Sequence, residues 1–175
     1  MEILCEHVQN RYCERKNIDR IYQQKSAEKF YGMLTDTEID CETLFMSGDS
    51  SIWERQKIIE KLSKLKSVIL VATQVIEAGV DIDMDIGYKD CSKLDSEEQF
   101  MGRINRSCKG EGIVYFFNLD SARMVYKDGD IRVDTEFTVM KTDMQEILRT
   151  KNFSDYYGEI LEIERNNKKA KTKII

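Results

Sequence analysis

Several residue types and patterns are missing from this chain of 175 residues, and each absence narrows the classes of protein to consider. No apolar run approaches the roughly 20 residues of a membrane-spanning helix, so we expect neither a membrane anchor nor a membrane partner. His7 is the only histidine and falls on the polar part of the first expected helix, so we interpret it as a surface residue. Histidine-based acid–base or metal chemistry therefore has no support, and we expect no metal ligands.

The cysteines and the net charge narrow the field further. Five cysteines are scattered along the chain without a CxxC pair, which disfavours disulfides and zinc and favours a reduced, cytoplasmic setting. The net charge of −5 counts against a stand-alone DNA-binding protein, although a few amides and hydroxyls in a cleft can still contact nucleic acid. Proline is absent altogether, and that absence excludes no function. No GxxxxGK[ST] sequence occurs, so the chain has no P-loop to hold nucleotide phosphates.

What is present is an alternation of two apolar periods, which is typical of a layered α/β domain. Residues 67–72 (SVILVA) are continuously apolar and predict a central strand covered on both faces. The remaining expected elements are helices at 2–16, 25–34, 51–65 and from about Asp95, strands at 18–23, 42–46, 83–88 and 112–118, and a charged helical tail. The strand at 18–23 is weakened by the polar residues Asp19 and Arg20. The order predicts a mostly parallel sheet whose functional edge is formed by the carboxyl ends of its strands.

The most informative segment is Gln99-Phe-Met-Gly-Arg-Ile-Asn-Arg106. On a helix, Gln99, Arg103 and Arg106 lie along one stripe because residues three and four apart share a face. An arginine fork is always charged and can bind a phosphate through two hydrogen bonds. Two such forks beside a cleft can neutralise the charge of a transferring phosphoryl group. A pair of arginines without other support is more often a solvated helix face.

A second segment, Val71-Ala-Thr-Gln-Val-Ile-Glu-Ala-Gly-Val-Asp-Ile82, precedes the first along the chain. Together the two segments resemble motifs V and VI of superfamily 2 helicases, which belong to the second of two RecA-like domains. Motif VI of that family is Gln-Arg-x-Gly-Arg-x-x-Arg, and the chain departs from it only at Phe100. The continuation, with Leu-Asp-Ser before the glutamine and GRINRSC at 102–108, is similar to the helicase–nuclease of type I CRISPR systems.

The resemblance implies a role for each matching residue. Arg103 and Arg106 correspond to the arginine fingers on the γ-phosphate and are the expected catalytic residues. The expected ATP-binding residues are Gly79, Asp81, Gln99 and Gly102, with Asp81 accepting a hydrogen bond from the ribose. The expected nucleic-acid contacts are Thr73, Gln74 and Ser47, which all follow expected strands.

The resemblance also implies that the chain is half of a motor. In the family, the P-loop and the Asp-Glu motif that holds Mg²⁺ belong to the first RecA-like domain, and this chain contains neither sequence. We therefore expect ATP with Mg²⁺ to require the first RecA-like domain as a partner, and the chain alone to be inactive as an ATPase. Single-stranded DNA is the other expected partner, and a CRISPR surveillance complex is a further candidate.

These observations predict a three-layer α/β fold of the RecA type, with a helical C-terminal extension. We expect a RecA-like helicase C-terminal domain over residues 1–135 and the charged extension over 136–175. The expected function is the C-terminal motor half of an ATP-dependent DNA helicase of CRISPR antiviral defence. Two alternatives remain open: a non-catalytic helicase fragment that acts as an interaction module, and a doubly wound nucleotide-binding domain that binds no nucleic acid.

Overall fold

The computed structural model describes residues 1–11, 15–37, 39–77, 80–119 and 135–172, which belong to two compact units. The first unit comprises Met1–Asp90 with Ser96–Asp120, and the second comprises Cys91–Asp95 with Ser121–Ile175. The expected domain boundary at residue 135 adjoins residues 120–134, which lie outside the described residues, and it stays a prediction. No helix in the described part of the chain is long and apolar enough to cross a membrane.

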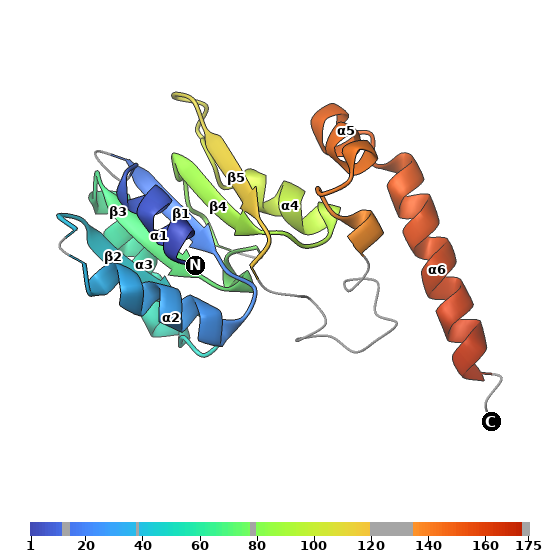
Figure 1. Cartoon of the computed structure of the whole chain (residues 1–175), viewed down its shortest axis with the longest axis horizontal. Helices are drawn as coiled ribbons and strands as arrows, with labels where there is room; N and C mark the ends of the chain where they lie inside the picture. The colour runs from blue at the N-terminus through green and yellow to red at the C-terminus, as the bar shows by residue number, and fades with distance from the viewer. Residues whose placement is uncertain (12–14, 38, 78–79, 120–134, 173–175) are drawn as a thin grey trace. The chain divides into compact units, whose positions relative to one another are not determined.

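The first unit is built around a five-stranded sheet in which every pair of neighbouring strands is parallel (Figure 1). The strand order is β2-β3-β1-β4-β5. The strands are β1 Lys16–Arg20, β2 Glu42–Met46, β3 Val68–Ala72, β4 Ile86–Asp90 and β5 Ile113–Phe117. The helices of this unit are α1 Glu2–Gln9, α2 Gln24–Thr35, α3 Ile52–Lys64 and α4 Leu94–Met101, which begins within the second unit's residues. The expected α/β fold is confirmed.

Strand β3 carries the core because its alternating side chains feed both faces of the sheet. Ile69 and Val71 pack with buried residues of α1 and α2 on one face. Val68, Leu70 and Ala72 pack with residues of α3 and α4 on the other face. All five residues of β3 are buried, so the expectation of a central, doubly covered strand is confirmed. The resulting three layers are visible in Figure 1.

Strand β1 differs from its prediction in its bounds. It spans Lys16–Arg20 rather than 18–23, and it lies between β3 and β4 near the middle of the sheet. Asp19 and Arg20 are nevertheless buried. The polar residues do not mark a loosened edge: Arg20 forms an ion pair with Glu77, and the Asp19 carboxyl is enclosed under α1.

The second unit is helical where the structure describes it, as predicted for the C-terminal extension. It contains a short 3₁₀ turn at Thr135–Phe137, α5 Thr142–Thr150 and α6 Ser154–Thr172. Tyr156 of α6 is buried, and its hydroxyl donates a hydrogen bond of 3.1 Å to the Asp95 carboxylate.

Candidate nucleotide and nucleic-acid sites

The carboxyl ends of β2 and β3 place two of the expected nucleic-acid residues side by side. Met46 and Ala72 are paired in the sheet register, so Ser47 and Thr73 both emerge one residue beyond it. The Thr73 amide donates to the Met46 carbonyl at 3.1 Å and extends the ladder by one bond. Sequence reasoning correctly expected these two residues at one edge of the sheet.

Ser47 and Thr73 are buried, however, and the exposed groups at this edge are their neighbours Gly48 and Gln74. The Ser47 hydroxyl accepts a hydrogen bond from the Asp49 amide. The Thr73 hydroxyl has no partner among the described residues. Gln74 therefore offers the most accessible of the three expected side chains.

Arg55 of α3 holds the loop after β2 in place, a role that sequence reasoning missed. Its guanidinium donates to the main-chain carbonyls of Ser50 at 2.9 Å and Gly48 at 2.9 Å. The loop leads into α3 through a capping box between Ser51 and Glu54, which satisfies the free amides at the helix start. The signal was present in the sequence as a Ser-x-x-Glu pattern before an arginine.

Residues 74–84, which we call the crossing segment, connect the carboxyl edge of β3 to the amino end of β4. The segment begins with a 3₁₀ turn at Gln74–Ile76 and buries Ile76, Val80, Ile82 and Met84 on the face covered by α3 and α4. It ends where Met84 forms a parallel bridge with Ile104, two residues before β4 begins. Gly79, an expected ATP-binding residue, lies outside the described residues.

The expectation that Gln99, Arg103 and Arg106 share one helical stripe is wrong. Helix α4 ends at Met101, and Gly102 and Arg103 form a turn instead of continuing the helix. The chain leaves the helix because Ile104 pairs with Met84: the Met84 amide donates to the Arg103 carbonyl at 3.0 Å, and the Asn105 amide donates to the Met84 carbonyl at 2.7 Å.

The same bridge corrects the expected position of the arginines. Because Met84 precedes β4, Arg103 and Arg106 lie beyond the amino end of that strand rather than at the carboxyl edge. Only the start of α4 is near the carboxyl edge. Gln99 is exposed on α4, and Gly102 is exposed in the turn that follows. The expected nucleic-acid residues thus lie near the start of the crossing segment and Arg106 lies near its far end, whereas the Arg103 side chain reaches back to the Ile76 and Glu77 carbonyls near the start.

Arg106 and Asp81, both expected at the nucleotide, contact each other directly. The Arg106 Nη1 and the Asp81 Oδ1 are 2.5 Å apart, and the two side chains remain 47% and 86% exposed. An ion pair with that much exposure contributes little to stability, of the order of 0–1 kcal/mol. Both groups are therefore available to exchange partners with a ligand.

Asp83, which sequence reasoning did not single out, holds the backbone at Arg106. Its carboxylate accepts hydrogen bonds from the amides of Arg106 at 2.7 Å and Ser107 at 3.3 Å. Partial burial opposes the charged form of Asp83. The hydrogen bonds from Ser107 and Arg106 outweigh that burial and lower the pKa of Asp83 below its usual value. Its place two residues after Asp81 in the sequence is the signal that could have identified it.

Arg103 is held differently, by main-chain carbonyls of the crossing segment. Its Nε lies 3.4 Å from the Ile76 oxygen, and its Nη2 lies 3.3 Å from the Glu77 oxygen. The side chain is half-buried. No carboxylate forms an ion pair with Arg103 among the described residues, so the contacts leave its positive charge unneutralised.

Beneath Arg103, a cluster of buried charges joins the crossing segment to β1, β4 and α4. The Glu77 carboxylate accepts from Arg20 at 2.8 Å and from the Ser96 hydroxyl at 2.8 Å. Lys89 lies 2.7 Å from Glu97 and 3.9 Å from Glu77. Burial and the positive charge of Arg20 lower the pKa of Lys89, while the two glutamates oppose that shift.

The residue that departs from the helicase motif, Phe100, belongs to the core. It is fully buried between α4 and the sheet, against Gly87 of β4. A Cβ at Gly87 would lie 2.7 Å from the Phe100 ring and 2.9 Å from the Ile104 side chain. Glycine in β4 thus allows the aromatic ring to lie close to the sheet. It also allows residues 102–106, which we call the arginine-bearing turn, to lie close to the sheet.

With this geometry established, comparison with known proteins decides the family. A family model described as the C-terminal part of the CRISPR-associated nuclease/helicase Cas3 matches residues 2–109, more than half of the chain. The chain belongs to this family. The matched range contains all nine of the expected site residues, and no curated protein matches the chain in sequence.

Solved structures similar to the chain include helicases of two kinds. T. fusca Cas3 with ADP matches with a TM-score of 0.63 and 16% identity over 98% of this chain and 24% of that protein. S. cerevisiae Dbp5 bound to RNA and ADP BeF3 matches with a TM-score of 0.55 and 18% identity over 68% of this chain and 32% of that one. This Cas3-family chain covers between about a quarter and a third of the length of these two proteins. The similarity shows a shared RecA-like fold.

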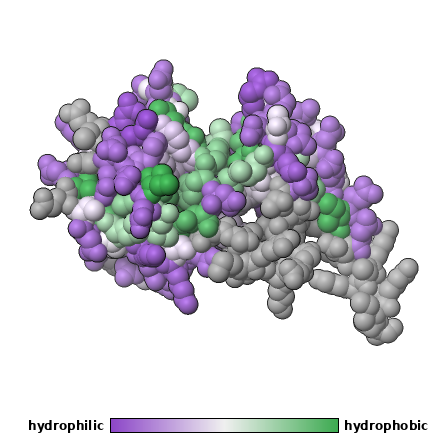
Figure 2. Space-filling model, viewed as in Figure 1, coloured by the Kyte–Doolittle hydropathy of each residue, from purple (hydrophilic) through white to green (hydrophobic). Residues whose placement is uncertain are grey.

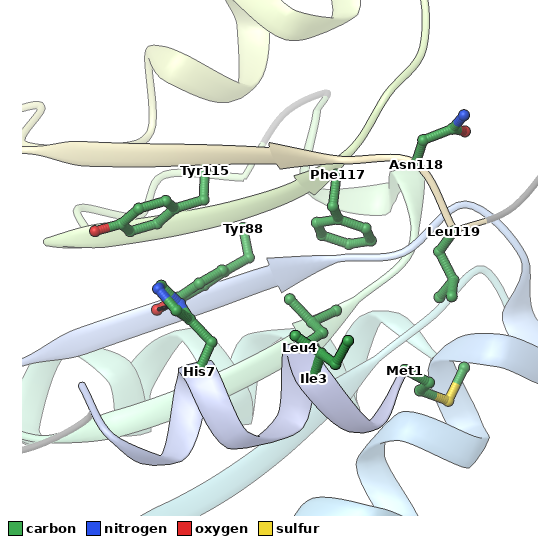
Figure 3. Close-up of a pocket in the computed structure, with 9 residues that line it drawn as sticks. All are labelled: Met1, Ile3, Leu4, His7, Tyr88, Tyr115, Phe117, Asn118 and Leu119. Atoms are coloured by element: carbon green, nitrogen blue, oxygen red, sulfur yellow. Dashed lines mark hydrogen bonds between the residues drawn. The ribbon is translucent and has the colours of Figure 1, made fainter.

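This member of the Cas3 family also has a surface groove, and none of the expected site residues lines it. Figure 2 shows hydrophobic residues gathered where α1 lies against β5, and a groove of about 440 Å³ is found there. His7 packs edge-on against Tyr88 and Tyr115, and its Nδ1 lies 3.2 Å from the Tyr88 hydroxyl (Figure 3). His7 is thus half-buried rather than plainly exposed, because Tyr88 of β4 and Tyr115 of β5 pack against its ring.

Proposed function

We propose that this chain is the C-terminal motor half of an ATP-dependent DNA helicase of CRISPR antiviral defence. Its family and its RecA-like fold support a helicase domain that works within a larger protein. The observation that carries the finer proposal is the segment after α4: Arg106 contacts Asp81 at the surface, and Arg103 lies three residues earlier without an acidic partner among the described residues.

The residues present fit a nucleotide held between this chain and a first RecA-like domain. ATP supplies the phosphoryl group whose transfer to water releases energy for movement. Arg103 and Arg106 bring two guanidinium groups toward the phosphates, and Asp81 accepts from the ribose. Gln99 and Gly102 flank the phosphates from α4 and the turn behind it. We assign Mg²⁺ to the first domain, because the Asp-Glu motif that would hold it does not occur in this sequence.

Exchange of partners is the physical step that this arrangement allows. In the structure Arg106 is paired with Asp81, so binding of the ribose by Asp81 releases the Arg106 fork for a phosphate oxygen. Losing an exposed ion pair costs no more than about 1 kcal/mol, whereas a phosphate oxygen offers Arg106 a charge-assisted bond. Arg103 keeps its charge available for a phosphate, because its two long hydrogen bonds run to neutral carbonyls, which orient the guanidinium without neutralising it. Neither finger is buried in a strong ion pair that would hold it back.

We place single-stranded DNA at the carboxyl edge of β2 and β3. Gln74 is exposed there, and Gly48 leaves its main chain accessible in the loop held by Arg55. Ser47 and Thr73 support this edge from below, and the Thr73 hydroxyl is buried without a partner among the described residues, so a phosphate would reach it only if the edge opens. Contacts through amides and hydroxyls suit a chain whose net charge is −5, since they need no basic surface.

Reassembly with the first RecA-like domain tests the proposal. We expect this chain alone to hydrolyse little ATP, and the mixture to show ATPase activity that single-stranded DNA stimulates. Arg103→Ala and Arg106→Ala should each lower kcat by about 10³-fold or more, as for other arginine fingers. Arg149→Ala is the matched control, because Arg149 is exposed and pairs only with Glu146 of its own helix among the described residues.

Two results would contradict the proposal. Near-normal ATPase activity in Arg103→Ala would remove the finger role of that residue. Absence of ATPase activity in the wild-type mixture, with binding between the two domains intact, would favour the alternative in which the chain is an interaction module. RNA in place of DNA in the same assay determines which nucleic acid stimulates hydrolysis.

A further inference from the structure

Glu77 is the residue where the crossing segment and the buried charge cluster meet. Its carboxylate accepts from Arg20 and from Ser96, each at 2.8 Å. Its main-chain oxygen accepts from the Arg103 guanidinium at 3.3 Å. Its amide donates to the Gln74 oxygen at 3.1 Å and so closes the 3₁₀ turn. One residue thus links the scaffold, the turn and a proposed arginine finger.

We propose that Glu77 is a positioning residue that fixes the main-chain carbonyls which hold the guanidinium of Arg103. This inference rests on the proposed function, because it assigns a purpose to the placement of Arg103. Glu77 touches neither nucleotide nor nucleic acid in this scheme. It acts through the turn that it anchors.

The anchor is strong because the cluster is buried and balanced. The side chains of Arg20 and Glu77 are 4% and 15% exposed, and those of Lys89 and Glu97 are fully buried. With all four ionised, the two positive and two negative charges cancel. Removing one partner of a buried pair leaves the other charge uncompensated, which is strongly destabilising. The turn at Glu77 therefore cannot move far while the pairs with Arg20 and Ser96 remain intact.

Arg103, by contrast, is held weakly, and its position follows that of the turn. Its contacts of 3.4 Å and 3.3 Å are long for charge-assisted hydrogen bonds, which are ordinarily about 2.7–2.9 Å. Carbonyl oxygens orient a guanidinium without neutralising it, so the charge stays available for a phosphate. A carboxylate in the same place would have competed with the nucleotide. Holding Arg103 through main-chain oxygens of a turn that is itself anchored by a carboxylate avoids that competition.

The decisive experiment compares two glutamates of the same cluster in the reassembled enzyme. Glu77→Gln and Glu97→Gln each remove one negative charge, but only Glu77 belongs to the turn that holds Arg103. We expect both variants to lower the thermal stability of the chain. Only Glu77→Gln should lower kcat for ATP hydrolysis, by about 10- to 100-fold, as expected when a reacting group is misplaced. The KM for ATP should stay within about twofold of the wild type.

Equal losses of kcat in the two variants would overturn the proposal, since the effect would then follow the stability of the cluster. Unchanged kcat in Glu77→Gln would overturn it as well. If the wild-type mixture has no ATPase activity, the proposed function fails instead, and the side-chain measurement below still tests the position of Arg103.

A measurement on the chain alone makes the test independent of activity. The Arg103 Nε–H is hydrogen-bonded to the Ile76 oxygen, so its hydrogen exchange, followed by NMR, should be slower than that of the exposed Arg15, whose side chain has no hydrogen bond among the described residues. We expect this protection to persist in Glu97→Gln and to be lost in Glu77→Gln. Equal protection in both variants would contradict the role of Glu77.

Glu77→Asp covers the case in which Glu77→Gln does not fold. It keeps the negative charge of the cluster but shortens the side chain by one methylene, so the turn must shift to keep its partners. We expect near-normal stability with a partial loss of kcat and of Arg103 protection. Normal kcat and normal protection in a folded Glu77→Asp, together with an unfolded Glu77→Gln, would reduce Glu77 to a structural residue.

Discussion

The crossing segment carries an arginine–carboxylate pair near each end, and the two pairs differ in burial. At the carboxyl edge, Arg20 and Glu77 are 2.8 Å apart, with side chains 4% and 15% exposed. Toward the amino end of β4, Arg106 and Asp81 are 2.5 Å apart, with side chains 47% and 86% exposed. The residue types are the same and the distances are similar. Only the surroundings differ.

The difference in burial gives the two pairs different roles: the Arg20–Glu77 pair fixes the fold, and the Arg106–Asp81 pair can exchange partners. Water screens the exposed pair, so either partner can be lost at little cost. The buried pair has no water to replace a missing partner, so the segment is fixed where that pair lies. In the proposed function, a nucleotide would displace Asp81 from Arg106 without moving the turn at Glu77. The same segment is anchored at one end and exchangeable at the other.

The largest expected effect comes from breaking the buried pair. Arg20→Leu leaves the Glu77 carboxylate inside the unit without its closest cation, and we expect the free energy of unfolding to fall by about 3–5 kcal/mol. Denaturant unfolding of the isolated chain measures the change. Arg149→Leu, which breaks an exposed pair on α5, should change stability by no more than about 0.5 kcal/mol. Similar losses in the two variants would remove the distinction drawn from burial.

The packing around the arginine-bearing turn gives the next largest effect. In Gly87→Ala the new methyl group would lie 2.7 Å from the Phe100 ring and 2.9 Å from Ile104, so α4 and the turn must shift. We expect a loss of about 1–3 kcal/mol, as for other overpacked cores. Gly32→Ala on α2 has nothing within 4 Å of the added atom and should stabilise the chain by up to about 1 kcal/mol. A neutral Gly87→Ala would show that the core tolerates movement of α4.

Sequence reasoning recovered the elements whose signal is local. β2 has the predicted bounds. β3 is central and covered on both faces, because the side chains of a continuously apolar strand point to both faces of the sheet and all need to be buried. It misplaced the bounds of β1, where the burial of Arg20 depends on Glu77, a partner far away in the sequence. No local pattern contains that pairing.

The prediction that α4 continues through Arg106 failed for a related reason. The spacing of Gln99, Arg103 and Arg106 fits a helix, but the tertiary bridge between Ile104 and Met84 ends the helix first. The motif therefore gave the arginines the wrong local structure, and the site residues that it names together stay a prediction. Asp83 and Glu77 were missed because their contacts run to backbone groups and buried charges that only the fold brings together.

Asp19 sharpens the comparison, because it is buried like Glu77 but lacks a partner among the described residues. Burial without a partner raises the pKa of Asp19 well above its usual value. Since the folded pKa exceeds the unfolded one, stability is lost as the pH rises above the unfolded value of about 3.9. Asp19→Asn should thus stabilise the chain at pH 7, by about 1 kcal/mol or more, and the gain should vanish near pH 4.

Denaturant unfolding of wild type and Asp19→Asn at both pH values measures this double difference, in which the other titrating groups cancel. A destabilised variant at pH 7 would mean that the Asp19 carboxylate has a partner in solution. The sign separates burial from pairing: losing a buried charge that is paired harms the fold, whereas losing one that is unpaired helps it.

The smallest expected effect on stability is at the exposed pair, and there the functional effect should be out of proportion to it. Asp81→Asn removes the partner of Arg106, yet we expect the free energy of unfolding to change by no more than about 0.5 kcal/mol, and by less in high salt. In the reassembled enzyme the same variant should bind ATP more weakly, because in the proposed role of Asp81 a neutral amide oxygen is a weaker acceptor for the ribose hydroxyl than a carboxylate. A loss of stability comparable to that of Arg20→Leu would show that Asp81 and Arg106 belong to the scaffold, and then neither could be released to a nucleotide.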